Sequence, residues 1–374
     1  MRIVQWLAHS IEEYDQLRLL TELGHTVFSP GAYIDPRHPA DDKRPPLDID
    51  PIADMKAAVD ALGQPQHPKH GTCDGTSAHV DTVEASKRQT PDEIIEWADV
   101  LIVHHLEHTW LIPQWGRIRG RCRVIWRTVG QSAHPNEWMM KPLRREGLEI
   151  VRYSPKERNI PEFAGEDALI RFYKDPAEWN GWTGEDAVVT NVTQQLYGRS
   201  LADDGQLQPM GKQWTSYSFW EAATRGLPRR PGGPGSERIG GTGPLTPEAM
   251  QDLLRKSRCY IYCGTQPASY TLGLIEAMMT GIPVISIGPE WFQILPYGPE
   301  LFEGHELVIR PRHDAQEAHA IARQLLVEHG LAQLLSEQTR AHAIDLFGKA
   351  KIAAQWQSFL AGQAVAQPEM AAVA

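Results

Sequence analysis

One acidic residue in an apolar helix marks the part of the chain best suited to chemistry. Residues 260–286 read YIYCGTQPASYTLGLIEAMMTGIPVIS, and Glu276 stands between Ile275 and Ala277 in the helical stretch of this segment. A carboxylate in such surroundings needs a partner. The polar loop before the helix offers backbone N–H groups, and the helix dipole favours an anion at that end. The pattern predicts a seat for a diphosphate, with Glu276 one turn away and placed to accept hydrogen bonds from ribose hydroxyls.

The residues of this seat follow one another along the loop and the first turn of the helix. The backbone N–H groups that would hold phosphate are those of Thr271, Leu272 and Gly273. Ser269 and Tyr270 would line the side of the sugar or the phosphate. Glu276 has an alternative role as a structural carboxylate that caps a neighbouring loop, and the surrounding pattern favours the ribose role.

The stretch resembles the donor-site signature of retaining GT-B glycosyltransferases, which is Glu-x7-Glu followed by Ala-Met and Gly-x-Pro-Val. The second Glu corresponds to Glu276, and Ala268 occupies the position of the first. The match continues through Ala277, Met278, Gly281, Pro283 and Val284. In that family the first Glu contacts the transferred sugar, so Ala268 bears on sugar identity and efficiency.

The resemblance implies an α/β protein of the GT-B fold, with two Rossmann-like domains facing across a cleft. It implies a hexosyltransferase-like enzyme that moves a sugar from a UDP- or GDP-sugar to an acceptor hydroxyl, with retention at the anomeric carbon. No cofactor is expected besides this donor co-substrate. Two alternatives remain open. One is a sugar-nucleotide epimerase of GT-B fold, and the other is a nucleotide-sugar binding protein that has lost catalysis, which Ala268 would explain.

A departing nucleoside diphosphate needs positive charge beside it where no metal supplies it. In the family an Arg and a Lys after the first strands of the C-terminal domain supply this charge, and Arg199 and Lys212 are the nearest candidates. Arg230, which stands with Arg229 beside the Gly-rich segment 231–243, competes with them. A solvated basic loop explains each of these residues equally well.

Histidines follow a predicted buried strand at residues 100–104. Loops at the carboxyl ends of parallel strands are where α/β sheets bind ligands, so His104 and His105 are candidate catalytic residues that would hydrogen-bond acceptor hydroxyls or the sugar. A zinc site with His108 is the weaker alternative, because no carboxylate or thiolate at clear ligand spacing completes it. A histidine in such a cluster is also more often structural than catalytic. The Asp-x-Asp at 48–50 lies in a Pro-rich loop of the N-terminal half, so no metal is expected.

The apolar pattern opens with a strand, a helix and a strand, as in doubly wound folds. Buried parallel strands are expected at 100–104 and 123–127, and a helix capped by Thr246 should lead to a strand at 260–263. A late strand is expected at 303–310. The polar segment 175–185 is the expected linker. The domains are therefore predicted as an acceptor domain at 1–184, a donor domain at 185–345, and a final helix returning to the first domain with a frayed tail at 346–374.

Composition agrees with a two-domain enzyme. The chain has 374 residues, of which 41% are hydrophobic, and a formal net charge of −10, which argues weakly against general nucleic-acid binding. No apolar run is long enough to span a bilayer, and the N-terminus lacks the pattern of a signal peptide. The four cysteines are scattered and are expected to be core thiols of a cytoplasmic protein.

A basic window stands out in this acidic chain. Between residues 117 and 145 the only acidic residue is Glu137. We call this segment the basic window, and its basic residues are Arg117, Arg119, Arg121, Arg123, Arg127, Lys141, Arg144 and Arg145. Trp126 and Trp138 interleave with it. The functional interpretation is a surface for an anionic acceptor, namely a phosphorylated glycan or lipid or a hydroxymethylated DNA base, and the alternative is a solvated face with salt bridges.

Overall fold

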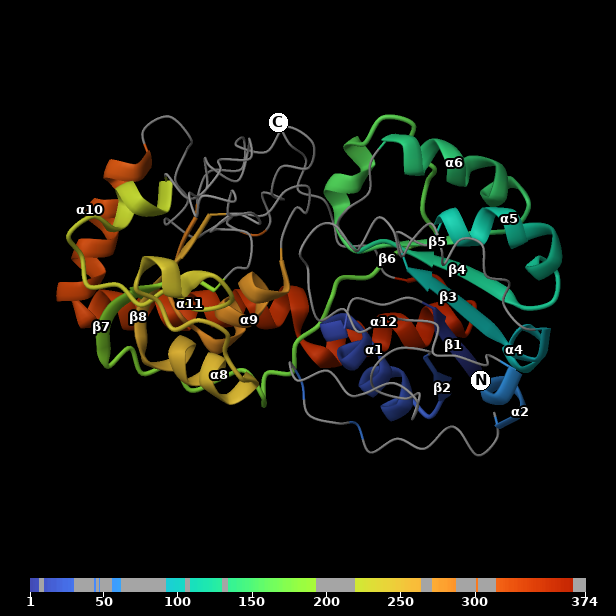
Figure 1. The fold of residues 1–374 in the computed structure, drawn as a ribbon, viewed down its shortest axis with the longest axis horizontal. Coiled ribbons are helices and arrows are strands. Elements are labelled where there is room, and N and C mark those ends of the chain that lie inside the picture. The colour runs from blue at the N-terminus through green and yellow to red at the C-terminus, as the bar shows by residue number, and fades with distance from the viewer. Residues whose placement is uncertain are drawn as a thin grey trace. The chain divides into compact units, whose positions relative to one another are not determined.

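The structure is a computed structural model that describes residues 1–6, 10–29, 44, 47, 56–61, 92–104, 108–129, 134–192, 219–263, 271–286, 301 and 314–365. Its contacts divide the chain into two compact units, Met1–Tyr173 with Ala350–Ala374 and Lys174–Lys349 (Figure 1). The domain boundaries expected from the sequence were 184–185 and 345–346. Each unit is described below by itself.

The first unit is built on a parallel six-stranded sheet with the order β2-β1-β3-β4-β5-β6. Its middle strand β3 is buried at every residue, as a parallel strand covered on both faces must be. The strands are β1 (Arg2–Trp6), β2 (Thr26–Phe28), β3 (Val100–His104), β4 (Arg123–Arg127), β5 (Glu149–Arg152) and β6 (Ala168–Leu169).

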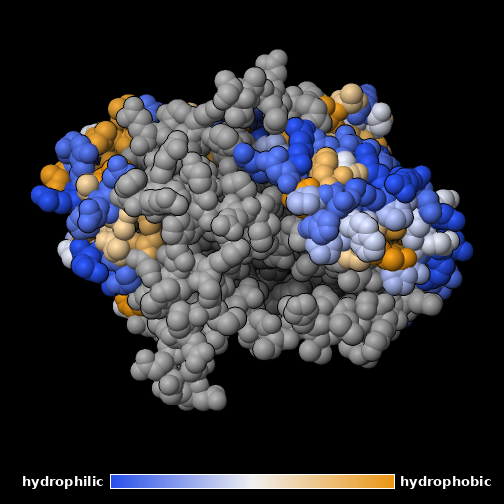
Figure 2. Space-filling model, turned by 90° about the horizontal axis from the view of Figure 1, so that it is seen from above, coloured by the Kyte–Doolittle hydropathy of each residue, from blue (hydrophilic) through white to orange (hydrophobic). Residues whose placement is uncertain are grey.

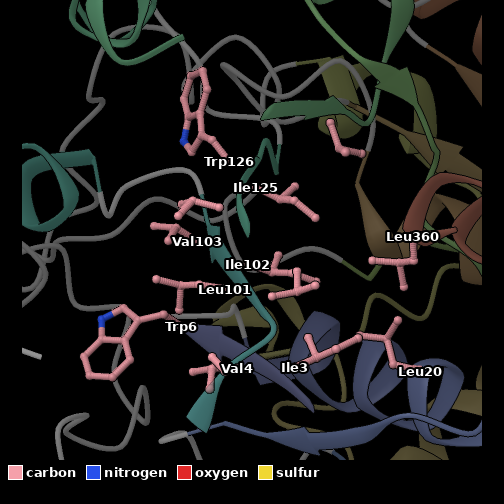
Figure 3. Packing of buried hydrophobic residues seen from close by; sticks show 14 of the residues in the cluster. Ile3, Val4, Trp6, Leu20, Leu101, Ile102, Val103, Ile125, Trp126 and Leu360 are labelled. Carbon is pink, nitrogen blue, oxygen red and sulfur yellow. The ribbon is translucent and has the colours of Figure 1, made fainter. Parts of the chain in front are cut away.

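Helices lie on both faces of this sheet. They are α1 (Ser10–Glu22), α2 (Lys56–Ala61), α4 (Asp92–Trp97), α5 (His108–Ile118), α6 (His134–Arg145), α12 (Lys349–Leu360) and the 3-10 helix η3 (Pro155–Asn159). Figure 3 shows Ile3, Ile102 and Ile125 on the side of the sheet where Leu20 of α1 and Leu360 of α12 lie. One face of α12, the last helix among the described residues, therefore packs into the core of the first unit through Ile352, Trp356, Phe359 and Leu360.

The second unit has a parallel three-stranded sheet with the order β7-β8-β9. Its strands are β7 (Asp186–Thr190), β8 (Ser257–Tyr262) and β9 (Val284–Ser286). Its helices include α8 (Pro247–Lys256), α9 (Leu272–Thr280), α10 (Asp314–Val327), α11 (His329–Phe347) and the 3-10 helix η4 (Ser236–Ile239).

The connections in this unit create a topological switch point at β7. After β7 the chain returns beside it, where Arg229 and Gly232 form parallel bridges with Val189 and Val192. It then passes through α8 to β8, on the other side of β7. In open α/β sheets, ligands bind outside the carboxyl ends of the strands at such a point.

Most expected elements of the second unit are present, with one shifted boundary. Thr246 caps α8 as predicted, its side chain accepting a hydrogen bond from Ala249 N at 3.3 Å. Strand β8 begins at Ser257, before the predicted Tyr260. The earlier start was not predicted because the interior of a strand rarely holds a charged residue such as Arg258. In the structure the Arg258 guanidinium donates hydrogen bonds to backbone carbonyls, including that of Gly184 at 2.6 Å. The strand expected at 303–310 lies outside the described residues.

Candidate donor and acceptor sites

The first turn of α9 has the form expected of an anion seat. Thr271 is the N-cap, and its side chain accepts a hydrogen bond from Leu274 N at 3.3 Å. Ile275 N donates to Thr271 O at 3.2 Å. The N–H groups of Leu272 and Gly273 precede the first intrahelical hydrogen bond, and both residues are half-buried. They are thus the amides through which this turn can hold a phosphate.

Gly273 fixes where this turn sits. A Cβ on Gly273 would lie 3.3 Å from the carbonyl oxygen of Val192, which follows β7. The hydroxyl of Tyr260 in β8 donates to the same carbonyl at 3.3 Å. The first turn of α9 is therefore packed against the carboxyl end of β7, beside the switch point. A side chain at position 273 would make a tight contact with the strand, so Val192 or the turn must give by a few tenths of an ångström.

Glu276 has a cation as its partner inside the second unit. Its Oε1 lies 2.7 Å from Nζ of Lys174, and the two side chains are 2% and 1% exposed. The sequence predicted that this carboxylate needs a partner but did not identify Lys174. The ion pair meets that need without a ligand, so the ribose role of Glu276 stays a prediction.

The other end of α9 is also held by a cation. Gly281 is the C-cap with φ 94°, and its N–H donates to Ala277 O at 3.2 Å. Arg340 of α11 donates to Met279 O, to Trp179 O at 2.6 Å and to Pro176 O at 2.9 Å. The helix is thereby fixed to α11 and to the segment that follows Lys174.

Arg229 and Arg230 point toward carboxylates of their own unit. Arg230 Nη1 lies 2.7 Å from Asp186 Oδ2, and Arg229 Nη1 lies 2.8 Å from Glu221 Oε1. Asp186 is the first residue of β7, at the end of the strand opposite to the α9 seat. Contact between Arg230 and a diphosphate in that seat would require its side chain to leave Asp186, and its donor role stays a prediction.

Five other residues proposed from the sequence fall outside the described residues. These are His105, Arg199, Lys212, Ser269 and Tyr270. Their roles stay predictions.

An open groove elsewhere in the second unit is distinct from this seat. It has a volume of about 470 Å³ and is lined by Ala187, Pro228, His319 and Leu326, among others. Ala187 lies near the start of β7, so the groove is at the amino end of the strand. Ligands of α/β sheets bind at the opposite end.

In the first unit, polar side chains gather where β1, β3 and β4 end. His104 and Arg127 are paired in register at the ends of β3 and β4, and Gln5 of β1 is paired with Ile102. Side chains alternate along a strand, so Gln5, His104 and Arg127 project from one face of the sheet. All three are at most 2% exposed. The apolar face formed by the middle of the sheet thus becomes polar at its carboxyl edge.

Glu12 from the first turn of α1 completes this cluster. Its Oε2 lies 3.6 Å from His104 Nδ1, and its Oε1 lies 3.7 Å from Arg127 Nε. These distances are too long for direct hydrogen bonds. Among the described residues, both ring nitrogens of His104, the amide of Gln5 and Glu12 Oε1 are buried without a hydrogen-bond partner. Buried polar groups without hydrogen bonds need an explanation, and a role in ligand binding is one.

The basic window is largely neutralised by carboxylates from outside it, which the sequence did not reveal. Arg121 pairs with Asp92 at 2.6 Å and Arg123 with Glu149 at 2.5 Å. The other pairs are Arg117–Asp92, Arg119–Glu146, Lys141–Glu162 and Arg144–Asp167. Glu137, which appeared to be the counter-charge of the window, instead pairs with Arg152. The structure therefore favours the solvated face with salt bridges.

The tryptophans of the window differ in access. Trp126 is fully buried, so its ring cannot stack against a DNA base in this structure. Trp138 of α6 is 63% exposed. Arg145 lies seven residues later on the same side of α6 and is also exposed. The coloured residues in Figure 2 are mostly hydrophilic, with apolar residues scattered among them.

The described residues contain neither a metal-binding cluster nor a membrane-spanning helix. No group of three or more His, Cys, Asp or Glu side chains within the described ranges is arranged to hold a metal ion. None of the helices in the described part combines the length and the apolarity that a membrane span needs.

Comparison with known proteins identifies the architecture. Neither a family model nor a curated protein matches the chain. The solved structure of HepE from Anabaena in complex with UDP and glucose has a TM-score of 0.60 and 13% identity, covering 97% of this chain and 100% of that one. A glycosyltransferase from Rickettsia africae has a TM-score of 0.55 and 11% identity, covering 96% and 97%. The chain has the fold of these glycosyltransferases. The expected GT-B fold class is thereby confirmed.

Proposed function

We propose that the protein is a glycosyltransferase that moves a sugar from a nucleoside-diphosphate sugar to an acceptor hydroxyl. The observation that carries this proposal is the first turn of α9, packed through Gly273 against Val192 at the switch point of the second unit. The similar HepE has been solved with UDP-glucose, and this supports a UDP-sugar as the donor here. GDP- and TDP-sugars are the alternatives.

On the donor side, the N–H groups of Leu272 and Gly273 bind the diphosphate, and the dipole of α9 stabilises its charge as it leaves. Thr271, Ser269 and Tyr270 line this seat. Glu276 accepts hydrogen bonds from the ribose hydroxyls. Positive charge for the departing diphosphate comes from residues that follow the first strands of this unit, namely Arg199, Lys212 and Arg230.

On the acceptor side, His104 and His105 hydrogen-bond the acceptor hydroxyl, and the Glu12 carboxylate lies 3.6 Å from the His104 ring. The ring nitrogens of His104, buried without a hydrogen-bond partner among the described residues, support this role. Retention of the anomeric configuration follows from the resemblance of the Glu276 segment to retaining enzymes, with Ala268 in place of the first Glu.

Because most of the basic window is paired, we favour a neutral hydroxylic acceptor such as a sugar. An anionic acceptor, whether a phosphorylated glycan, a phosphorylated lipid or hydroxymethylated DNA, is the second candidate. It is supported by exposed Trp138 and Arg145 on one side of α6.

A panel of UDP-, GDP- and TDP-sugars tests the proposal by thermal shift, because a ligand of the native state raises its melting temperature. The donor with the largest shift is then incubated, radiolabelled, with a panel of acceptors. We expect labelled product and free nucleoside diphosphate only when an acceptor is present. Turnover of donor alone would indicate the epimerase alternative, and binding without release of diphosphate would indicate an inactive binding protein.

A further inference from the structure

Lys174 lies at one of the two points where the chain passes between its units. The units change over at Tyr173–Lys174 and again at Lys349–Ala350. Lys174 N donates to Phe347 O at 3.0 Å, and Lys174 forms a parallel bridge with Gly348. Lys349 Nζ lies 3.0 Å from Asp175 Oδ2. The two passages, which are the stretches where the chain leaves one unit for the other, are thus bonded to each other through residues of the second unit.

From this position the side chain of Lys174 enters the second unit and reaches Glu276. The two charged atoms are 2.7 Å apart in a site that excludes water from both side chains. The ammonium also lies 5.8 Å from the centre of the Trp179 ring, which is itself buried. A buried charge requires partners of this kind. Lys174 and Glu276 therefore stabilise each other inside the second unit.

The same part of the chain also holds the far end of α9. Arg340 joins the carbonyls of Pro176 and Trp179, just after Lys174, to the carbonyl of Met279. Helix α9 is thus attached to the passage between the units at its middle, through Glu276, and at its C-terminal end. Its N-terminal turn remains as the part that would face a diphosphate.

We infer that Lys174 is a positioning residue for the nucleotide-sugar donor. It fixes the orientation of the Glu276 carboxylate through the 2.7 Å ion pair, so that the carboxylate is a positioned, charged acceptor for the ribose hydroxyls. The inference rests on the proposed function, because it assigns the ribose to Glu276. It makes donor binding depend on a residue at the passage between the units.

Calorimetry with UDP-glucose, or with the better donor of the thermal-shift panel, tests this inference on the full chain. Lys174→Met should raise the donor Kd on the order of 10- to 100-fold, as expected when one partner of a buried charge pair is removed. Lys174→Arg should recover most of this loss because it restores the cation. In kinetics, Lys174→Met should raise the donor KM more than it lowers kcat, whereas a purely structural role would lower the active fraction and leave KM unchanged.

Lys349→Met is the matched control, because it removes the other ion pair of the passages, the pair with Asp175, and leaves the Lys174–Glu276 pair in place. Its donor Kd should stay within about twofold of the wild type, in line with a partly exposed pair. If Lys174→Met fails to fold, Lys174→Met combined with Glu276→Gln removes both buried charges. That double variant should bind the donor as weakly as Glu276→Gln alone, and weaker binding would overturn the inference.

Two further results have distinct meanings. Wild-type donor affinity in Lys174→Met, together with loss of affinity in Glu276→Gln, would overturn the inference and leave the proposed donor site intact. Wild-type affinity in both variants would remove Glu276 from the donor site, and the inference with it.

Discussion

Glu137 of α6 and Arg152 of β5 form an ion pair in which both side chains are fully buried. Arg152 Nη2 lies 2.7 Å from Glu137 Oε2, which also accepts Ala164 N at 2.9 Å. The guanidinium donates to Gly165 O at 3.0 Å and lies over the ring of Phe163, 4.5 Å from its centre. This network ties α6, β5 and the segment before β6 together.

Glu137→Gln should destabilise the first unit by about 3–5 kcal/mol, because it leaves the Arg152 guanidinium buried without its counter-charge. Urea denaturation followed by tryptophan fluorescence measures the change. Glu162→Gln, which breaks the surface pair with Lys141, is the control and should not change the unfolding midpoint. Equal midpoints for the two variants would contradict a stabilising role for the buried pair.

The helices and strands were predictable because the sequence signals that start and end them involve residues close together in the chain. The apolar run of β3, the Thr246 cap and the Gly281 stop each depend on a few neighbouring residues. The partner of Glu276 was not predictable, since Lys174 is distant in sequence and only the fold brings it close. The partners of the basic window were not predictable for the same reason, since Asp92 and Glu162 reach it from other parts of the sequence.

Gly273→Ala should weaken donor binding several-fold. The new methyl group would lie 3.3 Å from Val192 O, so the first turn of α9 or Val192 must shift by a few tenths of an ångström. Gly330→Ala in α11 is the control, since a Cβ there meets nothing within 4 Å. Calorimetry with the donor should show wild-type affinity for Gly330→Ala. Unchanged affinity in both variants would separate this turn from the donor.

Ala268→Glu restores the carboxylate that retaining GT-B enzymes carry at this position. We expect it to change the sugar preference or the turnover rate more than the affinity for the nucleotide, because the family residue contacts the sugar. Rates with a panel of UDP-sugars, beside the Kd of UDP itself, measure the two effects. Ala268→Gln is the neutral control. A change confined to UDP affinity would show that the loop is aligned wrongly.

The described thiols should be unreactive in the native protein. Burial raises the pKa of Cys122 to about 11 and that of Cys259 to about 12, and it raises the pKa of Cys263 further. At pH 8 only about 0.1% of Cys122 would be thiolate, the form that reacts. In a Cys73→Ser background, Ellman's reagent should label none of the three until guanidinium unfolds the chain. Labelling of Cys122 within minutes at pH 8 would contradict this.

The salt dependence of the acceptor KM distinguishes the two acceptor classes. Arg119 and Arg121 are already paired with Glu146 and Asp92, so Arg119→Ala combined with Arg121→Ala should change the acceptor KM by less than about twofold. The KM should also vary little between low and moderate salt. A steep rise with salt, lost in Arg145→Ala, would instead select an anionic acceptor at α6.

The position of α12 has a consequence for biosynthesis. Trp356, Phe359 and Leu360 belong to the core of the first unit, and the carbonyls of Phe359 and Leu360 accept hydrogen bonds from Arg123. On the ribosome these residues emerge only after the whole of the second unit. The nascent first unit must therefore wait with only α1 on that side of its sheet, and a chain interrupted before Ile352 would leave the part that α12 covers open to chaperones and proteases.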